Sequence, residues 1–411
     1  MNSDSAASVW EFSVAANITF GVGAVTELGE IAAQFDADSV LIVTDQGLVA
    51  AGIIDAVTAS LDSHEWRVFD QVVPDPALET FEDAIAMATA EEPDLVVGVG
   101  GGSAMDVAKT TSIVAEHGGD VLDYVSPPTG KGQPVPGRGI PCVAIATTAG
   151  TGSETSPVSV ISLPDEDLKV GISSQFIRPD VALVDPELTV SLPPEPTASS
   201  GMDALSHAIE AYVTRPYDAF TAPASRGERP DYIGRSLITD QIARPAIELI
   251  GEHLLTAVDD GKNLTARRNM SLASLMAGIA FTNAGLGATH AIAMATGAIK
   301  HTPHGITIAH TLPAVIRYNA RTEPDRYAEI ASLLGIDTAG MGKREAAHEA
   351  ANAVDSLAAD VGIRGGLSAL DIDETEISHL AERSHQLQRL LAGNPRDVSQ
   401  SDLESILHDA L

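Results

Sequence analysis

Short runs of β-branched residues alternate with helical stretches between about Ser39 and Asp185. The clearest strands are the apolar segments SVLIVTD, DLVVGVG, PCVAIATT and VALVD. Continuous apolar strands, each followed by a crossover, are typical of a parallel sheet that is covered on both faces. The pattern therefore predicts an α/β domain over residues 1–192.

The pattern changes after LPPEPTASSG, a connection rich in proline and serine. Strand signals largely stop there, and apolar positions recur with helical spacing at 199–213, 236–258, 263–283, 304–319, 323–334, 343–361 and 400–411. We therefore predict a second, all-helical domain over residues 193–411. The stretch RPYDAFTAPASRGERPDYIGRS interrupts these helices with prolines and is typical of a long surface loop.

Composition narrows the kind of site that this chain can build. Its 411 residues, 44% of them hydrophobic, are enough for two packed domains. Cys142 is the only cysteine, so any metal must be held by histidines and carboxylates. The N-terminus MNSDSAASVWEF carries acids in place of a basic signal segment, and no apolar run is long enough to span a bilayer. We therefore expect a cytoplasmic protein that enters no membrane.

The net charge excludes two classes of partner. It is −33, from 24 basic and 57 acidic residues, and six of the basic residues are lysines against eighteen arginines. Such a surface repels nucleic acids and anionic membranes, which attract positive charge. The acids are spread through the whole chain, which favours a salt-adapted, halophilic surface over an acidic interaction tail.

A glycine-rich turn follows one of the predicted strands. DLVVGVGGGSAMDVAK indicates a buried strand, a turn at Gly100, Gly101 and Gly102, and a helix capped by Ser103. Glycines let the backbone approach a ligand closely, and the first turn of a helix favours a phosphate. The alternative is an ordinary turn between a strand and a helix.

Two other strand ends carry chemistry of a similar kind. Asp45 ends VLIVTD, where its carboxylate could bind a ribose diol and would repel a 2′-phosphate, which favours NAD over NADP. Thr147, Thr148 and Thr151 follow the strand of IATTAGTGSE. Three such ends suit a dinucleotide beyond the carboxyl edge of a sheet, although none matches the strict GxGxxG fingerprint.

Two segments of the predicted helical domain supply candidate metal ligands. GMDALSHAIEAY places Asp203 and His207 four residues apart, on one face of a helix. THAIAMATGAIKHTPHG adds His290, His301 and His304. Taken by itself, the pair Asp203 and His207 is typical of two surface residues that share a hydrogen bond, and a single histidine is typical of a core residue. Together, Asp203, His207, His290 and His304 suit Fe²⁺ or Zn²⁺ with one position left for a substrate.

The motifs GGGSAMDVAK, TTAGTGSE, GMDALSHAIEAY, HAIAMATG, TPHG and GNPR resemble, in order and spacing, those of the iron-containing alcohol dehydrogenases. The resemblance implies a dinucleotide-binding α/β domain and an all-α metal-binding domain, the fold shared with dehydroquinate synthase. It implies reversible hydride transfer between NAD, or alternatively NADP, and a small primary alcohol or hydroxyacid, in a homodimer or larger homo-oligomer. It assigns the metal, Fe²⁺ or alternatively Zn²⁺, to Asp203, His207, His290 and His304. The cofactor-binding residues we expect are Asp45, Gly101, Gly102, Ser103, Asp106, Thr147, Thr148, Thr151 and Lys169.

One position departs from the family pattern. Many members have a second histidine, assigned to proton relay, where this chain has Met294. The relay must then use His301, ordered water or the cofactor ribose, and we take His290, His304 and His301 as the catalytic set. The alternative for His301 is a solvated residue at a helix end.

The proline-rich insert resembles the hydroxyacid–oxoacid transhydrogenase branch, which also tends to lack that histidine. The insert concentrates four arginines that could bind a substrate carboxylate, or else pair with nearby acids: Arg215, Arg226, Arg229 and Arg235. The remaining alternatives are a transhydrogenase that retains its cofactor, a lyase like dehydroquinate synthase, and a catalytically silent metal-binding scaffold.

Overall fold

The computed structural model describes residues 6–225, 229–230 and 232–411. Contacts within the chain divide it into two compact units. The α/β unit is Val14–Leu192, and the helical unit is Pro193–Leu411 together with the N-terminal residues up to Ser13. Ser13 joins the helical unit because its backbone N–H and carbonyl both bond to the Asn283 side chain.

The α/β unit is built on a six-stranded sheet in which every strand pair is parallel. The strand order is β1-β8-β5-β4-β2-β3, with bounds Asn17–Phe20, Val181–Val184, Cys142–Ala146, Leu95–Gly100, Ser39–Val43 and Glu65–Phe69. The four strands recognised in the sequence are β2, β4, β5 and β8. The fold class predicted for this part of the chain is confirmed.

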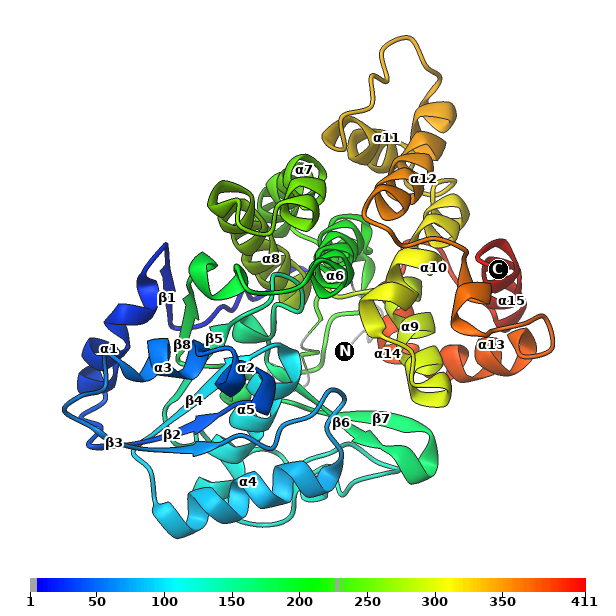
Figure 1. Ribbon diagram of the computed structural model, residues 1–411. Helices are drawn as coiled ribbons and strands as arrows, with labels where there is room; N and C mark the ends of the chain where they lie inside the picture. The colour runs from blue at the N-terminus through cyan, green and yellow to red at the C-terminus, as the bar shows by residue number, and fades with distance from the viewer. Residues whose placement is uncertain (1–5, 226–228, 231) are drawn as a thin grey trace. The chain divides into compact units, whose positions relative to one another are not determined.

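Helices cover both faces of this sheet (Figure 1). Alternate residues along each strand point to opposite faces of the sheet, and both sets are apolar. Ile42 and Val97 pack in one apolar cluster with α1 (Leu28–Gln34) and α3 (Ile53–Thr58). Their neighbours Leu41 and Val96 pack in the other, with α4 (Leu78–Glu91) and α5 (Gly102–His117). A short α2 (Gln46–Ala50) follows β2, and an antiparallel hairpin of β6 (Val158–Leu163) and β7 (Leu168–Ser173) follows β5.

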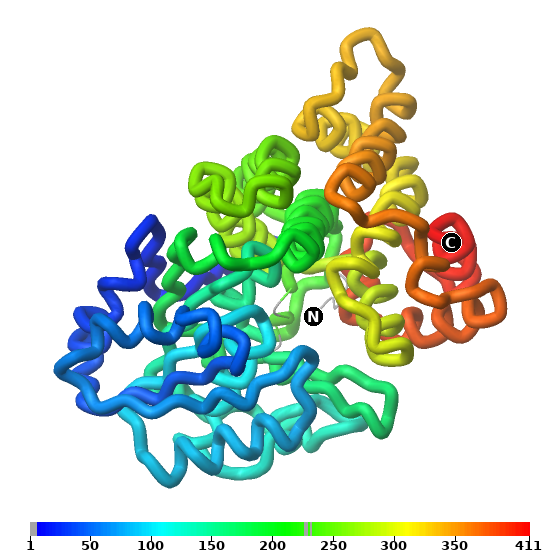
Figure 2. Tube along the Cα trace, in the orientation of Figure 1, coloured from blue at the N-terminus to red at the C-terminus, as the bar shows by residue number. Residues whose placement is uncertain are grey.

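The helical unit packs around α6 (Pro194–Val213). Every α6 residue from Gly201 to Val213 is buried, and α6 packs against α7, α8 and α10. Figure 2 follows the chain from α6 to the C-terminal helix. The other helices are α7 (Leu237–Asp259), α8 (Leu264–Ala284), α9 (Ala288–Lys300), α10 (His304–Asn319), α11 (Pro324–Leu333), α12 (Lys343–Asp360), α13 (Ile377–Gln386), α14 (Gln388–Leu391) and α15 (Gln400–Asp409).

Membrane-spanning potential is confined to one bent pair among the described helices. No single described helix is long and apolar enough to cross a bilayer. Helices α8 and α9 reach the required length and composition only together, with a 100° bend between them. Most residues of both helices are buried within the helical unit.

Candidate metal centre and nucleotide groove

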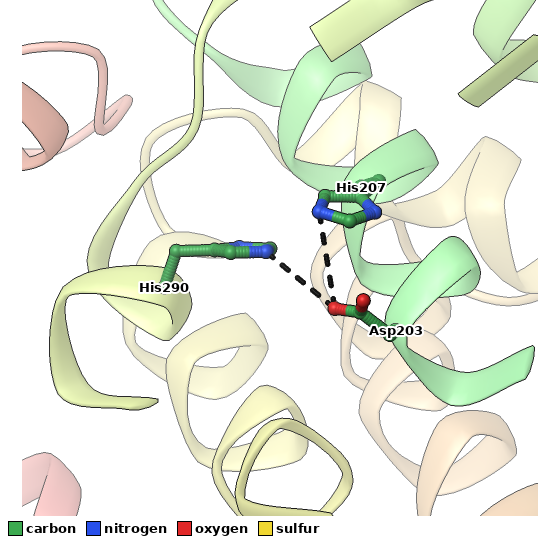
Figure 3. A group of neighbouring side chains, drawn as sticks. All are labelled: Asp203, His207 and His290. Atoms are coloured by element: carbon green, nitrogen blue, oxygen red, sulfur yellow. Dashed lines mark ion pairs between the residues drawn. The ribbon is translucent and has the colours of Figure 1, made fainter. Parts of the chain in front are cut away.

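Three imidazoles of the helical unit converge on one carboxylate oxygen. Oδ1 of Asp203 lies 3.8 Å from Nε2 of His207 and 3.7 Å from Nε2 of His290 (Figure 3). Nε2 of His304 also lies 3.7 Å from that oxygen. Ligand atoms bound at 2.0–2.2 Å to one tetrahedral ion are about 3.3–3.6 Å apart, so these spacings are close to those that an ion requires.

Local structure explains how these four side chains meet. Helix α6 presents Asp203 and His207 one turn apart, while α9 supplies His290. His304 is the first residue of α10, which begins against α6: a Cβ at Gly305 would lie 2.2 Å from the carbonyl oxygen of Ser199. The glycine of TPHG therefore permits the close approach that places His304 at the cluster.

The cluster is buried on all but one side. Asp203, His207 and His290 are each at most 5% exposed, and their candidate ligand atoms lie within 4.8 Å of one another. The His207 ring stacks between Phe281 and His290, with centroids 4.2 Å and 4.6 Å away. The His304 side chain is 35% exposed, so a substrate would reach the cluster beside it.

The polar atoms of the cluster fit a bound cation. Oδ1 of Asp203 and Nε2 of His290 are both buried, and neither has a hydrogen-bond partner among the described residues. Unpaired buried polar atoms are costly, and an ion coordinated by both atoms would remove that cost. Burial alone would raise the pKa of Asp203, but the neighbouring imidazoles hold it well below its usual range, so the side chain is a carboxylate.

Sequence reasoning missed a second buried carboxylate beside this cluster. Glu210 accepts a hydrogen bond from Nδ1 of His290 at 2.7 Å. Its position three residues after His207 and seven after Asp203, on the same helical face, is the signal that could have identified it.

The residues considered for proton relay occupy different parts of α9. Met294 is half-buried one turn after His290. His301 is exposed at the C-terminal end of the helix, where it adopts a left-handed conformation with φ 50°. Eleven residues separate it from His290, which corresponds to about 16 Å along a helix axis.

The α/β unit has an open groove at the carboxyl edge of its sheet. Strands β2 and β4 are neighbours, yet the helices that follow them pack on opposite faces, and ligands bind at such a switch point in open α/β sheets. The space in this groove that water-sized molecules can enter is about 610 Å³. Its walls are the loops after β2, β3 and β4, represented by Asp45, Asp70 and Gly101.

Glycines open the floor of this groove. Gly100 has a φ of 154°, and a Cβ there would lie 2.7 Å from that of Ala104. Helix α5 begins at Gly102 with Gly101 as its N-cap, so Ser103 is not the cap that the sequence suggested. The backbone already turns into the helix at the glycines, so the N-cap is Gly101, two residues before Ser103. Ser103 itself lines the groove.

The predicted threonines lie beside these glycines. A Cβ on Gly101 would be 3.7 Å from Oγ1 of Thr148, and one on Gly102 would be 3.2 Å from the Thr151 side chain. Oγ1 of Thr148 is buried without a hydrogen-bond partner among the described residues, which leaves it available to a ligand. Thr147 is buried and donates its backbone N–H to the carbonyl of Gly100 at 3.0 Å.

Asp45 and Asp106 have different surroundings. Asp45 lines the groove and also caps α2, accepting the N–H of Leu48 at 3.0 Å. Asp106 is buried, with its oxygens accepting hydrogen bonds from Oγ of Ser153 at 2.6 Å and from N–H of Val160 at 2.9 Å. The Lys109 ammonium lies 2.8 Å from the same carboxylate. Asp106 therefore ties the loop after β5 to α5.

Lys169, the last of the predicted cofactor residues, lies on β7. Its ammonium pairs with Asp75 at 2.6 Å. Asp75 directly follows Pro74, the last residue of a segment that lines the groove.

Three of the four arginines in the proline-rich insert have acidic partners within the helical unit. Arg215 pairs with Asp397, Arg235 with Glu323, and Arg229 with Glu11. Arg226 lies outside the described residues. The three described arginines therefore each have an acidic partner, and these partners are distant in sequence.

A parallel sheet with a candidate nucleotide groove and a helical unit with a carboxylate–imidazole cluster are the two parts expected of an oxidoreductase that uses a metal ion and a nicotinamide dinucleotide. Residues 15–186 match the model of iron-containing alcohol dehydrogenases, and residues 233–411 match the C-terminal part of the same family. The chain belongs to the iron-containing alcohol dehydrogenase family. It is therefore an oxidoreductase that acts on alcohols.

Both alcohol dehydrogenases and hydroxyacid–oxoacid transhydrogenases are similar to this protein over nearly the whole chain. A long-chain-alcohol dehydrogenase of Geobacillus thermodenitrificans is 38% identical, covering 95% of this chain and 94% of its own. The mitochondrial hydroxyacid–oxoacid transhydrogenase of Mus musculus is 33% identical, with 96% and 89% covered. A 1,3-propanediol oxidoreductase structure matches with a TM-score of 0.89 at 34% identity, covering 98% of this chain and all of its own.

Proposed function

We propose that this protein is an NAD-dependent dehydrogenase that reversibly oxidises small primary alcohols or hydroxyacids. The iron ion would be held by Asp203, His207, His290 and His304. The observation that carries the proposal is the convergence of three imidazoles on Oδ1 of Asp203, with that oxygen and Nε2 of His290 left unpaired in a buried site. Dehydrogenases among the relatives, at 36–38% identity, support it.

In the forward direction the alcohol loses a hydride to NAD⁺ and a proton to solvent, which gives a carbonyl compound and NADH. A divalent ion supplies Lewis acidity that lowers the pKa of the substrate hydroxyl. Asp203, His207, His290 and His304 would hold that ion, and the exposed edge at His304 would be the approach for substrate. In the α/β unit, the glycine turn and the first turn of α5 would bind the pyrophosphate.

The proton leaves by a route that avoids position 294. A thioether cannot carry a proton, and His301 is exposed at the C-terminal end of α9. We assign the relay to water or to the ribose hydroxyls of the cofactor. His301 takes no part in this proposal.

A transhydrogenase that keeps its cofactor bound is the second candidate. The similarity to the mitochondrial hydroxyacid–oxoacid transhydrogenases, at 32–33% identity over 96% of this chain, favours it. In that reaction the hydride passes from a hydroxyacid to an oxoacid, and NAD⁺ from solution is not consumed.

Absorbance at 340 nm separates the two candidates. Metal-loaded protein in molar salt is given NAD⁺ or NADP⁺ with small primary alcohols or 4-hydroxybutyrate, with and without 2-oxoglutarate. Bulk reduction of NAD⁺ by the alcohol is expected. Consumption of hydroxyacid that depends on the oxoacid, without bulk reduction, would overturn the dehydrogenase in favour of the transhydrogenase.

Composition and family support four finer proposals. The net charge of −33 and the scarcity of lysine support a halophilic surface, which unfolding in low and molar potassium chloride would test. The family name supports iron over zinc, which elemental analysis would test.

We also propose a homo-oligomer, to be measured by light scattering, and a cytoplasmic location.

A further inference from the structure

Glu210, on α6, contacts both the ring of His290 and the start of α9, the helix that carries His290. It lies on α6 one turn after His207, and its side chain is buried at 4% exposure. Resting on the metal-dependent function proposed above, we propose that Glu210 is a positioning residue that orients the His290 ring and fixes its tautomer for metal binding.

The hydrogen bonds of Glu210 determine which ring nitrogen of His290 carries hydrogen. Oε2 lies 2.7 Å from Nδ1 of His290 and accepts the N–H of Gly287 at 3.0 Å, while Oε1 accepts the N–H of Thr289 at 2.8 Å. A carboxylate surrounded by donors acts as an acceptor, so Nδ1 must donate. In the neutral ring Nε2 then carries the lone pair that can bind a metal ion, and Nε2 faces Asp203 Oδ1 at 3.7 Å.

The same contacts fix the start of α9, the helix that carries His290. Gly287 is the N-cap of α9, and Thr289 is in its first turn, so Glu210 satisfies N–H groups that lack partners within the helix. Glu210 therefore holds both the backbone and the ring of this ligand.

Asn394, from the GNPR motif, completes this support. Its Oδ1 accepts the N–H of Ala288 at 3.3 Å, between the two N–H groups bound by Glu210. Asn394 and Asn319 exchange a pair of side-chain hydrogen bonds at 2.9 and 2.8 Å. Asn394 thus supports the same helix start without contacting the His290 ring.

Gly287 is the glycine that this arrangement requires. A Cβ there would lie 2.9 Å from Oδ1 of Asn394 and 3.1 Å from Oε1 of Glu210. The space for both acceptors therefore depends on a missing side chain, which accounts for the second glycine of GLGA before His290.

The test compares Glu210→Gln with Asn394→Ala as the matched control. Both weaken the start of α9, but only Glu210→Gln disturbs the acceptor for Nδ1 of His290. Affinity for Co²⁺ and Zn²⁺, measured by competition with a chromophoric chelator, is expected to fall about 10–100-fold in Glu210→Gln. Asn394→Ala is expected to lower thermal stability while its metal affinity stays within about threefold of the wild type. The visible spectrum of bound Co²⁺ should change only in Glu210→Gln.

A measurement on the unaltered protein covers the case in which Glu210→Gln fails to fold. Histidine-selective ¹⁵N NMR of the zinc-loaded protein should show hydrogen on Nδ1 of His290, and hydrogen on Nε2 instead would overturn the proposal. So would wild-type affinity and spectrum in Glu210→Gln, or equal loss of affinity in Asn394→Ala. Positioning confirmed by these readouts without alcohol oxidation would leave Glu210's role intact and refute only the proposed function. A wild type that binds no divalent ion would overturn both.

Discussion

The metal cluster and the nucleotide groove are built in opposite ways. The cluster depends on side chains that are present, one carboxylate and three imidazoles around one point. The groove depends on side chains that are absent, because Gly100, Gly101 and Gly102 leave the backbone open beside Thr148 and Thr151. Removing atoms should therefore damage the first region, and adding atoms should damage the second.

The largest effect is expected from removing a ligand. His290→Ala should lose its metal on dialysis and lower turnover at least about 10³-fold, because Lewis acidity contributes several kcal/mol to such reactions. Elemental analysis and steady-state kinetics measure the two losses together. His253→Ala is the control, since it removes a half-buried imidazole that bonds to Asn269 on a different pair of helices. Stoichiometric metal with undiminished turnover in His290→Ala would remove it from the ligand set.

Adding a side chain at Gly101 tests the other half of the comparison. Gly101 has a φ of −79°, which valine tolerates, and its Cβ would make ordinary contacts with Thr148 at 3.7 Å. Gly101→Val should fold, retain metal and weaken NAD⁺ binding about 10–100-fold, since the branched side chain enters the space proposed for the pyrophosphate. Titration calorimetry measures the affinity. Gly137→Val adds the same atoms outside the groove, and equal affinities in the two variants would contradict the assignment of the groove.

The two regions also differ in what the sequence could predict. The four most apolar strands were recognisable because both faces of the sheet are covered. In contrast, β3 was missed because EWRVF is largely exposed. Helix α9 was missed although it carries His290, because it is buried on nearly all sides and has no polar face to show a period.

Contacts distant in sequence account for most of the remaining omissions. Glu210 reaches His290 across 80 positions, and Asn394 reaches Ala288 across 106. Spacing on one helix could suggest Asp203, His207 and Glu210 as a group. Only the folded chain shows that Asn394 lies at the start of α9, so its role had no local signal.

Asp45 gives a smaller effect, on selectivity. Asp45→Ser keeps an oxygen that can cap α2 at the N–H of Leu48 and removes the negative charge from the groove. The ratio of kcat/KM for NADP⁺ to that for NAD⁺ should rise about tenfold, because repulsion of the 2′-phosphate is relieved. Initial rates with both cofactors measure it. Asp55→Ser removes an acid from α3 instead, and a similar rise in that variant would show that general charge, rather than Asp45, sets the preference.

A buried carboxyl in each of the two units gives the last comparison. Asp203 has three imidazoles around it, whereas Glu154, 2% exposed on the loop after β5, has no ion pair with a histidine among the described residues. Burial raises the pKa of Glu154 to about 7, and the charge of Lys109 opposes this only in part. The Lys109 ammonium is already bound by Asp106 and Ser153, at 2.8 and 2.7 Å.

The sign of the resulting pH dependence follows from linkage. The folded protein binds the Glu154 proton more tightly than the unfolded chain, whose ordinary value is 4.5. The stabilising contribution is complete below that value and is lost as the pH rises toward about 7. Glu154→Gln cannot ionise, so relative to it the wild type should lose about 1–3 kcal/mol of unfolding free energy between about pH 5 and about pH 8. Denaturant unfolding of both proteins at the two pH values measures this. A difference between wild type and Glu154→Gln that is the same at both pH values would mean that Glu154 is ionised throughout, with a charged partner as effective as the imidazoles around Asp203.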